Sequence, residues 1–153
     1  MKKITLLFLL LISAFYSHAL GRVIAYDEIH NSLFATIRSI TTCGQFSTKN
    51  TVGEVRLIQS YTYGGDMIFL DSIKMGDAGL EILHGLSISE INNDHTELTL
   101  QNIECRYLGS NAIEITGFVN GTGHDDSDKY NFIILYQADT GTYVFKQLTD
   151  KLK

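Results

Sequence analysis

From Val52 onward, short runs of alternating apolar and polar residues are separated by clusters of glycine, asparagine and aspartate. The first run, "TVGEVRLIQSYTY", ends at "GGD" (64–66), and similar runs follow it to the end of the chain. Alternation with a period of two is typical of half-buried β-strands. The connections are too short for parallel crossovers. The pattern predicts a curved antiparallel meander or a small barrel of about seven to eight strands.

Upstream of these runs, apolar residues recur at helical spacing between Tyr26 and Ile40, with acidic residues early and Arg38 late. This order suits the helix macrodipole and predicts an N-terminal helix. The stretch "TIRSITTC" (36–43) is rich in β-branched residues, which lose rotamer freedom in a helix. The alternative is a helix that ends near Phe34 and is followed by a strand. Gly44 is expected to end either element, and the predicted fold class is mainly β (α+β).

The run "TELTLQNIECRYLG" (96–109) changes phase within itself. Leu98 and Leu100 share one face, whereas Ile103 and Cys105 follow the opposite phase. A one-residue change of phase inside a strand indicates a bulge, which re-aims the side chains that follow. We therefore expect a bulge near residues 101–102, and it would point Cys105 toward the other cysteine.

The first residues predict export. Lys2 and Lys3 precede an apolar run over 4–15, and small residues follow it at Ser17 and Ala19. These are the parts of a secretory signal peptide, and the run is shorter than the roughly 20 apolar residues that span a bilayer. We expect a signal peptide over 1–19 and a single β-rich domain over 20–153, secreted or periplasmic and without membrane contact after cleavage.

Cys43 and Cys105 both fall in the predicted exported part. An even pair in an oxidising compartment favours a disulfide. A nucleophilic or zinc-binding role is the alternative, although zinc sites usually need three or four closely spaced ligands. We expect the disulfide.

Charge bears on the choice of partner. Without Lys2 and Lys3, 10 of the 12 basic residues remain against 17 acidic ones, which gives a net charge near −7. Nucleic-acid binding needs a cationic stripe to displace counterions, and the remaining arginines are scattered. Nucleic acid is therefore not an expected partner.

The stretch "NGTGHDDSDKY" (120–130) gathers acidic residues in a glycine-rich segment. Asp125, Asp126 and Asp128 are weak candidates for a metal site, but the spacing is not that of an EF-hand. The glycines and Ser127 suit a hairpin bend, so we expect a bend, no metal and no cofactor. Asn120 begins an Asn-Gly-Thr glycosylation pattern, whose use depends on the source organism.

No complete catalytic motif is recognised in the chain. His84 lies on an otherwise apolar face, where a hydrogen-bonded core histidine is more common than a general base or a ligand. Neither a G-x-S-x-G elbow nor an H-E-x-x-H helix occurs. The tyrosines and phenylalanines of the strands suit core packing, with partner contact as the alternative. We assign no catalytic residue and expect no enzyme.

The segments "YDEIHNSLF", "TIRSITTC", "GGDMIFLD" and "TELTLQNIEC" resemble the VirK family over residues 22–107. The likeness rests on Tyr26 and Leu33 before Cys43, and on a following sheet that carries Cys105. The family comprises small exported proteins first noted beside virulence genes, without an agreed activity. The resemblance implies export and no catalytic residues.

The hypothesis that follows is an exported, non-catalytic binding or interaction protein, with a possible host- or virulence-associated role, whose binding residues the sequence does not indicate. One alternative is a lipocalin-like carrier of a small apolar ligand, which requires a closed, hollow barrel. The other is a periplasmic inhibitor of a lysozyme-like hydrolase, since an acidic surface suits a cationic enzyme. A filled interior would favour the interaction protein over the carrier.

Overall fold

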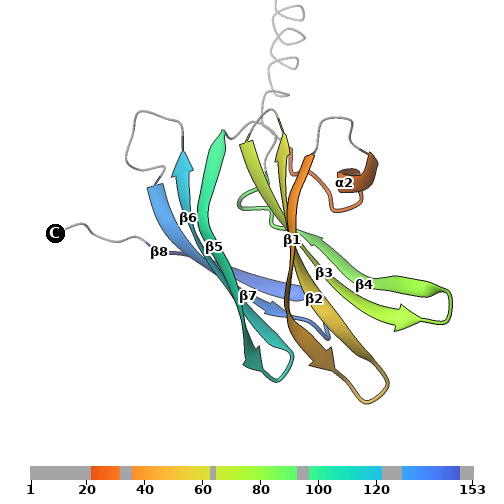
Figure 1. The fold of residues 1–153 in the computed structure, drawn as a ribbon. Helices are drawn as coiled ribbons and strands as arrows, with labels where there is room; N and C mark the ends of the chain where they lie inside the picture. Colours follow the sequence, from red (N-terminus) through yellow and green to blue (C-terminus); the bar gives the residue numbers. More distant parts are fainter. Residues whose placement is uncertain (1–21, 32–35, 63–64, 93–96, 122–128, 149–153) are drawn as a thin grey trace, which may run out of the picture.

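The computed structural model describes residues 22–31, 36–62, 65–92, 97–121 and 129–148 (Figure 1). The predicted signal peptide (1–19) and the candidate metal residues Asp125, Asp126 and Asp128 lie outside these ranges. So do Leu33 and Phe34, near which the predicted helix was expected to end. Within the described residues, no helix has the length and apolar character needed to cross a membrane.

Eight strands of the described chain form one sheet. They are β1 (Thr36–Ser47), β2 (Val52–Thr62), β3 (Gly65–Gly76), β4 (Gly79–Ser87), β5 (Leu98–Gly109), β6 (Ala112–Gly121), β7 (Lys129–Gln137) and β8 (Thr142–Leu148). Neighbours in the chain pair antiparallel, as predicted, except across the β4–β5 junction. There β3 meets β5 in parallel through the pair Gly65 and Leu98. The sheet therefore consists of two antiparallel halves, β1–β4 and β5–β8, with one parallel link between them.

The sheet is curved and open (Figure 1). The strand order runs β1-β2-β3-β5-β6-β7-β8, with β4 paired to β3 beside this path, and β1 does not pair with β8. The curved-sheet prediction is confirmed, and the small-barrel alternative is wrong. Closure into a barrel requires hydrogen bonding between the first and last strands, and here those two strands remain edges.

The main core lies between the two halves. Alternate residues of each strand point inward, as the period-two pattern predicts, and on β6 and β7 the inward positions are almost completely buried. The core combines side chains from both halves, among them Phe46, Val55, Leu57, Ile68, Leu70, Ile113, Ile115, Phe132, Ile134 and Tyr136. Large aromatic and branched side chains thus fill the space between the halves.

The N-terminal helix is not supported. A single turn, α2 (Glu28–Asn31), occupies this region, and the β-branched stretch 36–43 lies in β1, as the alternative reading expected. Gly44 does not end the strand. It lies at a register shift with φ 154°, and a β-carbon built there would be 3.0 Å from the β-carbon of Tyr107. The chain needs glycine at this position because β1 and β5 approach closely.

The predicted bulge in β5 is confirmed. The register with β6 shifts between Gln101 and Glu104, and Asn102 has a left-handed φ of 52°. As a result Leu98 and Leu100 before the bulge, and Ile103 and Cys105 after it, all pack against the main core.

Candidate interaction surface

The outer face of β2 and β3 carries a second apolar cluster. It consists of Ile58, Met67 and Phe69, covered by Ile24, Tyr26 and Ile29. We call residues 22–31 the strap, because this segment lies across the sheet. Both backbone polar groups of Ile24 are hydrogen-bonded: its N–H donates to the carbonyl of Asn92, and its carbonyl accepts from the hydroxyl of Ser87. The strap therefore buries one end of the outer face.

A buried carboxylate fixes the centre of the strap. Asp71 is fully buried, and Arg56 donates to both its oxygens over 2.9 and 2.6 Å. The Tyr26 hydroxyl donates to the same carboxylate over 2.6 Å. Burial, and then the hydrogen bond to Asp71, raise the pKa of the Tyr26 phenol far above its usual range. The hydrogen bonds to Asp71 likewise raise the pKa of Arg56. The carboxylate is therefore satisfied by one cation and one phenol, as a buried charge requires.

Beyond the strap, no other segment among the described residues covers the same outer face. Met75, Val52 and Leu80 have exposed fractions of 75%, 66% and 64%, the highest among the exposed large apolar side chains of the described residues. Met75 pairs with Leu80 across β3 and β4, and Val52 lies next to the pair formed by residues 53 and 74. Ile82 is 46% exposed and is one step further along the same face. We call Val52, Met75, Leu80 and Ile82 the hairpin patch.

A shallow pocket of about 290 Å³ lies within this patch, lined by Val52, Met75 and Leu80. Its charged lining residues are Glu54 and Lys74. Lys74 forms an ion pair with Glu81 over 3.1 Å, whereas Glu54 has no ion pair within the described part of the chain. Glu54 is therefore the charged lining residue of this pocket that lacks an ion pair among the described residues.

The patch ends at a sheet edge. Among the described strands, β4 pairs with β3 alone, and the β3–β4 hairpin projects from the body of the molecule (Figure 1). Edge strands are usually protected by proline, by charged side chains or by a helix or loop that covers the edge. The chain has no proline, and Glu81 is the single Asp, Glu, Lys or Arg in β4. Within the described chain, this edge therefore has few of the usual protections.

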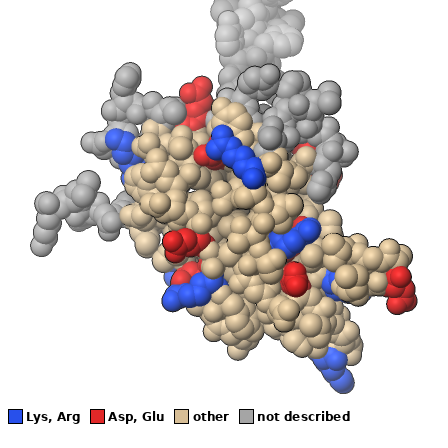
Figure 2. Space-filling view, in the orientation of Figure 1, with Lys and Arg blue, Asp and Glu red and all other residues tan. Residues whose placement is uncertain are grey.

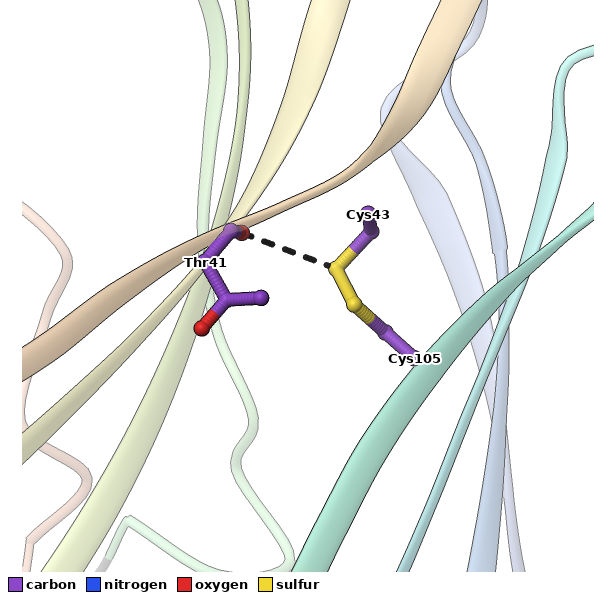
Figure 3. The surroundings of a disulfide bond; sticks show 3 residues. All are labelled: Thr41, Cys43 and Cys105. Carbon is purple, nitrogen blue, oxygen red and sulfur yellow. Dashed lines mark hydrogen bonds between the residues drawn. A yellow bond between two sulfur atoms is a disulfide. The ribbon is translucent and has the colours of Figure 1, made fainter.

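The two cysteines form a disulfide, with their Cα atoms 5.3 Å apart. The bond joins β1 to β5 across the two halves, and the Cys43 sulfur lies 3.7 Å from the carbonyl oxygen of Thr41 (Figure 3). No cysteine of the described chain is left for zinc or nucleophilic chemistry. The disulfide prediction is confirmed, and it is compatible with a secreted or periplasmic protein.

The other candidate residues do not converge on a site. His84 is half-buried and lies beside Gly141, in the turn between β7 and β8. Asn120 pairs with Thr99 and with Lys129 near the end of β6. No group of three or more metal-binding side chains occurs among the residues that the structure describes.

The aromatic residues divide between core and surface. Phe132 and Tyr136 are buried and Phe145 packs partly on the core, as the core interpretation predicts. Tyr61 is 42% exposed instead, and the Arg38 guanidinium carbon lies 4.4 Å from the centre of its ring. Tyr61 is therefore a surface residue in a cation–π contact.

Charges on the face in view lie singly or in small groups of mixed sign (Figure 2). Sequence reasoning missed both the Asp71 network and the hairpin patch. The signal for the first was an aspartate in the middle of the apolar run "MIFLDSIKM", where an unpaired charge would be very costly. The patch gave no comparable signal, because Met75 and Leu80 fit the same alternation as buried residues.

Comparisons of this chain with protein-family models, curated proteins and solved structures find no match. The resemblance to the VirK family therefore stays a prediction.

Proposed function

We propose that the protein is an exported, non-catalytic interaction protein that binds an extended segment of a partner protein at the hairpin patch. The observation that carries this proposal is the gathering of Val52, Met75 and Leu80 on three adjacent strands. Singly exposed apolar residues are ordinary, whereas a contiguous apolar patch is typical of an interaction site.

The surroundings of the patch specify the chemistry of the partner. The free edge of β4 supports strand addition, in which backbone hydrogen bonds give affinity and pockets give specificity. The 290 Å³ pocket has room for an apolar anchor side chain. Glu54 supports a lysine or arginine next to this anchor. The strap also shows that a polypeptide segment packs well on this outer face.

The filled interior favours this function over the lipocalin-like carrier. Phe46, Phe132 and Tyr136 are among the largest fully buried side chains, and they occupy the core between the halves. A carrier needs a hollow interior for its ligand. An inhibitor of a lysozyme-like hydrolase would be one form of the proposed interaction protein, and its cationic partner would suit Glu54.

The experiment is a selection from a random linear peptide library displayed on phage, with residues 20–153 as the immobilised target. The expected peptides carry an apolar residue next to lysine or arginine. Leu80→Asp should weaken their binding at least tenfold, because it places a charge where the anchor is buried. In hydrogen exchange, the bound peptide should slow the amides of β4, since strand addition occupies the free edge.

Val144→Asp is the matched control. Val144 is 55% exposed on β8, in the other half of the sheet, so its substitution should leave peptide binding unchanged. Failure to enrich any peptide, or equal losses in the two variants, would refute the proposal. Protection of β8 amides instead of β4 amides would do the same.

A further inference from the structure

A second hollow lies on the outer face of the other half of the sheet. Its volume is about 370 Å³, and strands β5, β6 and β7 contribute most of its lining. It forms where the β5 bulge interrupts the pairing with β6, opposite Gly117. Pockets of roughly 300 to 1,000 Å³ are the usual size for small-molecule sites. The hollow is thus a consequence of the bulge and has the size of a ligand site.

The bulge places an unusual residue in this pocket. Asn102 has a φ of 52°, lines the hollow and is exposed. Asparagine tolerates this left-handed conformation better than most residues do. Bulges recur beside functional sites, where they re-aim a side chain. The bulge therefore both opens the pocket and supplies it with an amide group.

The chemistry of the lining is amphipathic. The register sets Glu104 beside Thr116, and Phe118 beside Asn131, on neighbouring strands. The Asn102 amide, the Thr116 hydroxyl and the Glu104 carboxylate offer both donors and acceptors, while Phe118 offers an apolar aromatic surface. Glu104 is the single Asp, Glu, Lys or Arg in the pocket lining. A purely apolar ligand would displace water from Asn102, Thr116 and Glu104 without replacing its hydrogen bonds, and an anion would be repelled by Glu104.

From these observations we infer that the bulge pocket binds a neutral saccharide. A pyranose ring has hydroxyl groups around its rim, which match the Asn102 amide, Thr116 and Glu104. It also has an apolar C–H face, which matches Phe118. Because recognition uses both properties at once, the pocket selects polyhydroxylated rings over simple alcohols or hydrocarbons. The site lies on a different half from the hairpin patch, so it does not depend on the proposed function.

The test uses ¹⁵N-labelled protein (residues 20–153) titrated with three neutral trisaccharides: maltotriose, cellotriose and chitotriose. At least one should bind at concentrations up to about 10 mM, which is the range for a shallow site. The amide shifts should centre on residues 102–104, 116–118 and 131–133. Shifts confined to another surface, or no binding by any of the three, would overturn the inference.

Two variants remove the recognising groups. Asn102→Gly deletes the amide while keeping a residue that accepts the positive φ, and it should weaken binding about tenfold. Phe118→Leu removes the aromatic surface and should weaken binding to a similar degree. The matched control is Ser110→Gly, a second left-handed position (φ 49°) in the turn between β5 and β6, which should bind like the parent protein.

A charge control separates a saccharide site from a cation site. Glu104→Gln keeps the hydrogen-bonding shape but replaces a charged acceptor with a neutral one, so it should weaken neutral saccharide binding by up to about tenfold without abolishing it. A glucosamine trimer, which carries amino groups, should bind no more than about tenfold tighter than the neutral sugars. Binding of the glucosamine trimer alone, abolished by Glu104→Gln, would show a cation site and overturn the inference.

Discussion

At the scale of single residues, the strap packs closely on the sheet because residue 85 is a glycine, which has no side chain. A β-carbon built on Gly85 would lie 2.3 Å from the Tyr26 ring. The Tyr26 ring also meets Phe69 edge to face, with ring centres 6.4 Å apart. The absence of a side chain at residue 85 therefore lets Tyr26 lie close enough to the sheet to reach Asp71.

Gly85→Ala should destabilise the protein by about 1–3 kcal/mol, because the new methyl group overlaps the Tyr26 ring. Urea unfolding measures this loss. Gly76→Ala is the matched control in the same hairpin, since the nearest atom to its new β-carbon is a Glu81 carboxylate oxygen at 3.3 Å. If Gly85→Ala loses no more stability than Gly76→Ala, the conclusion that Tyr26 packs closely against residue 85 is wrong.

Tyr26→Phe removes the phenol that donates to Asp71 and should cost about 1.5–3 kcal/mol at pH 8, the range for a hydrogen bond to a charged group. The folded-state pKa of Tyr26 is raised, so its contribution is complete below the unfolded pKa of about 10 and declines as pH rises above it. The difference in unfolding free energy between parent and variant should therefore shrink between pH 8 and about pH 11.

Tyr61→Phe is the comparison for the size of the loss at pH 8, because Tyr61 is exposed and makes its contact through the ring. Its loss of stability at pH 8 should stay under about 0.5 kcal/mol. A Tyr26→Phe difference that stays constant from pH 8 to pH 11 would contradict the raised pKa.

At the scale of elements, the strands and the bulge could be predicted from local sequence, whereas contacts between residues far apart in the chain could not. Alternation and turn residues marked the strands, and the phase change in "TELTLQNIEC" located the bulge. The N-terminal helix was mispredicted because Ile37 and Ile40 fit a helical period by chance, although the β-branched stretch favours β1. The Asp71 network could not be derived, because its partners Tyr26 and Arg56 are 45 and 15 residues away in sequence.

The disulfide is the covalent link between elements of the two halves. Cys43→Ser, Cys105→Ser and the double variant should each lose about 2–4 kcal/mol, since the bond closes a loop of 62 residues and constrains the unfolded chain. Chemical unfolding of the three variants measures the loss. The double variant should be no less stable than either single variant, because all three lose the same bond. Additive losses in the double variant would contradict this explanation.

At the scale of the whole molecule, the two halves depend on a shared core. They are joined by one parallel pair, one disulfide, the apolar cluster between them and hydrogen bonds such as that between the Ser72 and Tyr136 hydroxyls. Each half alone would expose an apolar face to water. Because the halves bury these faces against each other, we expect them to fold cooperatively. The sequence predicted the alternation that creates these faces. It did not predict that the sheet stays open, because closure depends on the relative placement of β1 and β8, on which local patterns have no bearing.

The predicted signal-peptide cleavage site lies just before the strap, so the position of cleavage decides whether the strap contacts are kept. The first described contact of the strap is the ion pair of Arg22 with Glu28, over 2.7 Å. A chain that begins at Leu20 therefore keeps the described contacts of Ile24, Tyr26 and Ile29 with the sheet. Mass spectrometry of the exported protein should find this N-terminus, and retention of residues 1–19 would contradict the signal-peptide prediction.

A chain that begins at residue 32 should behave differently, because it lacks the strap and uncovers Ile58, Met67 and Phe69, which are now almost fully buried. Each such side chain contributes about 1.5–3 kcal/mol when removed from water. Only part of that is lost in this case, since one face alone becomes exposed. We expect a melting temperature at least about 10 °C below that of the chain from Leu20, with increased binding of a hydrophobic dye. If the two chains melt together, the strap is not part of the folded unit.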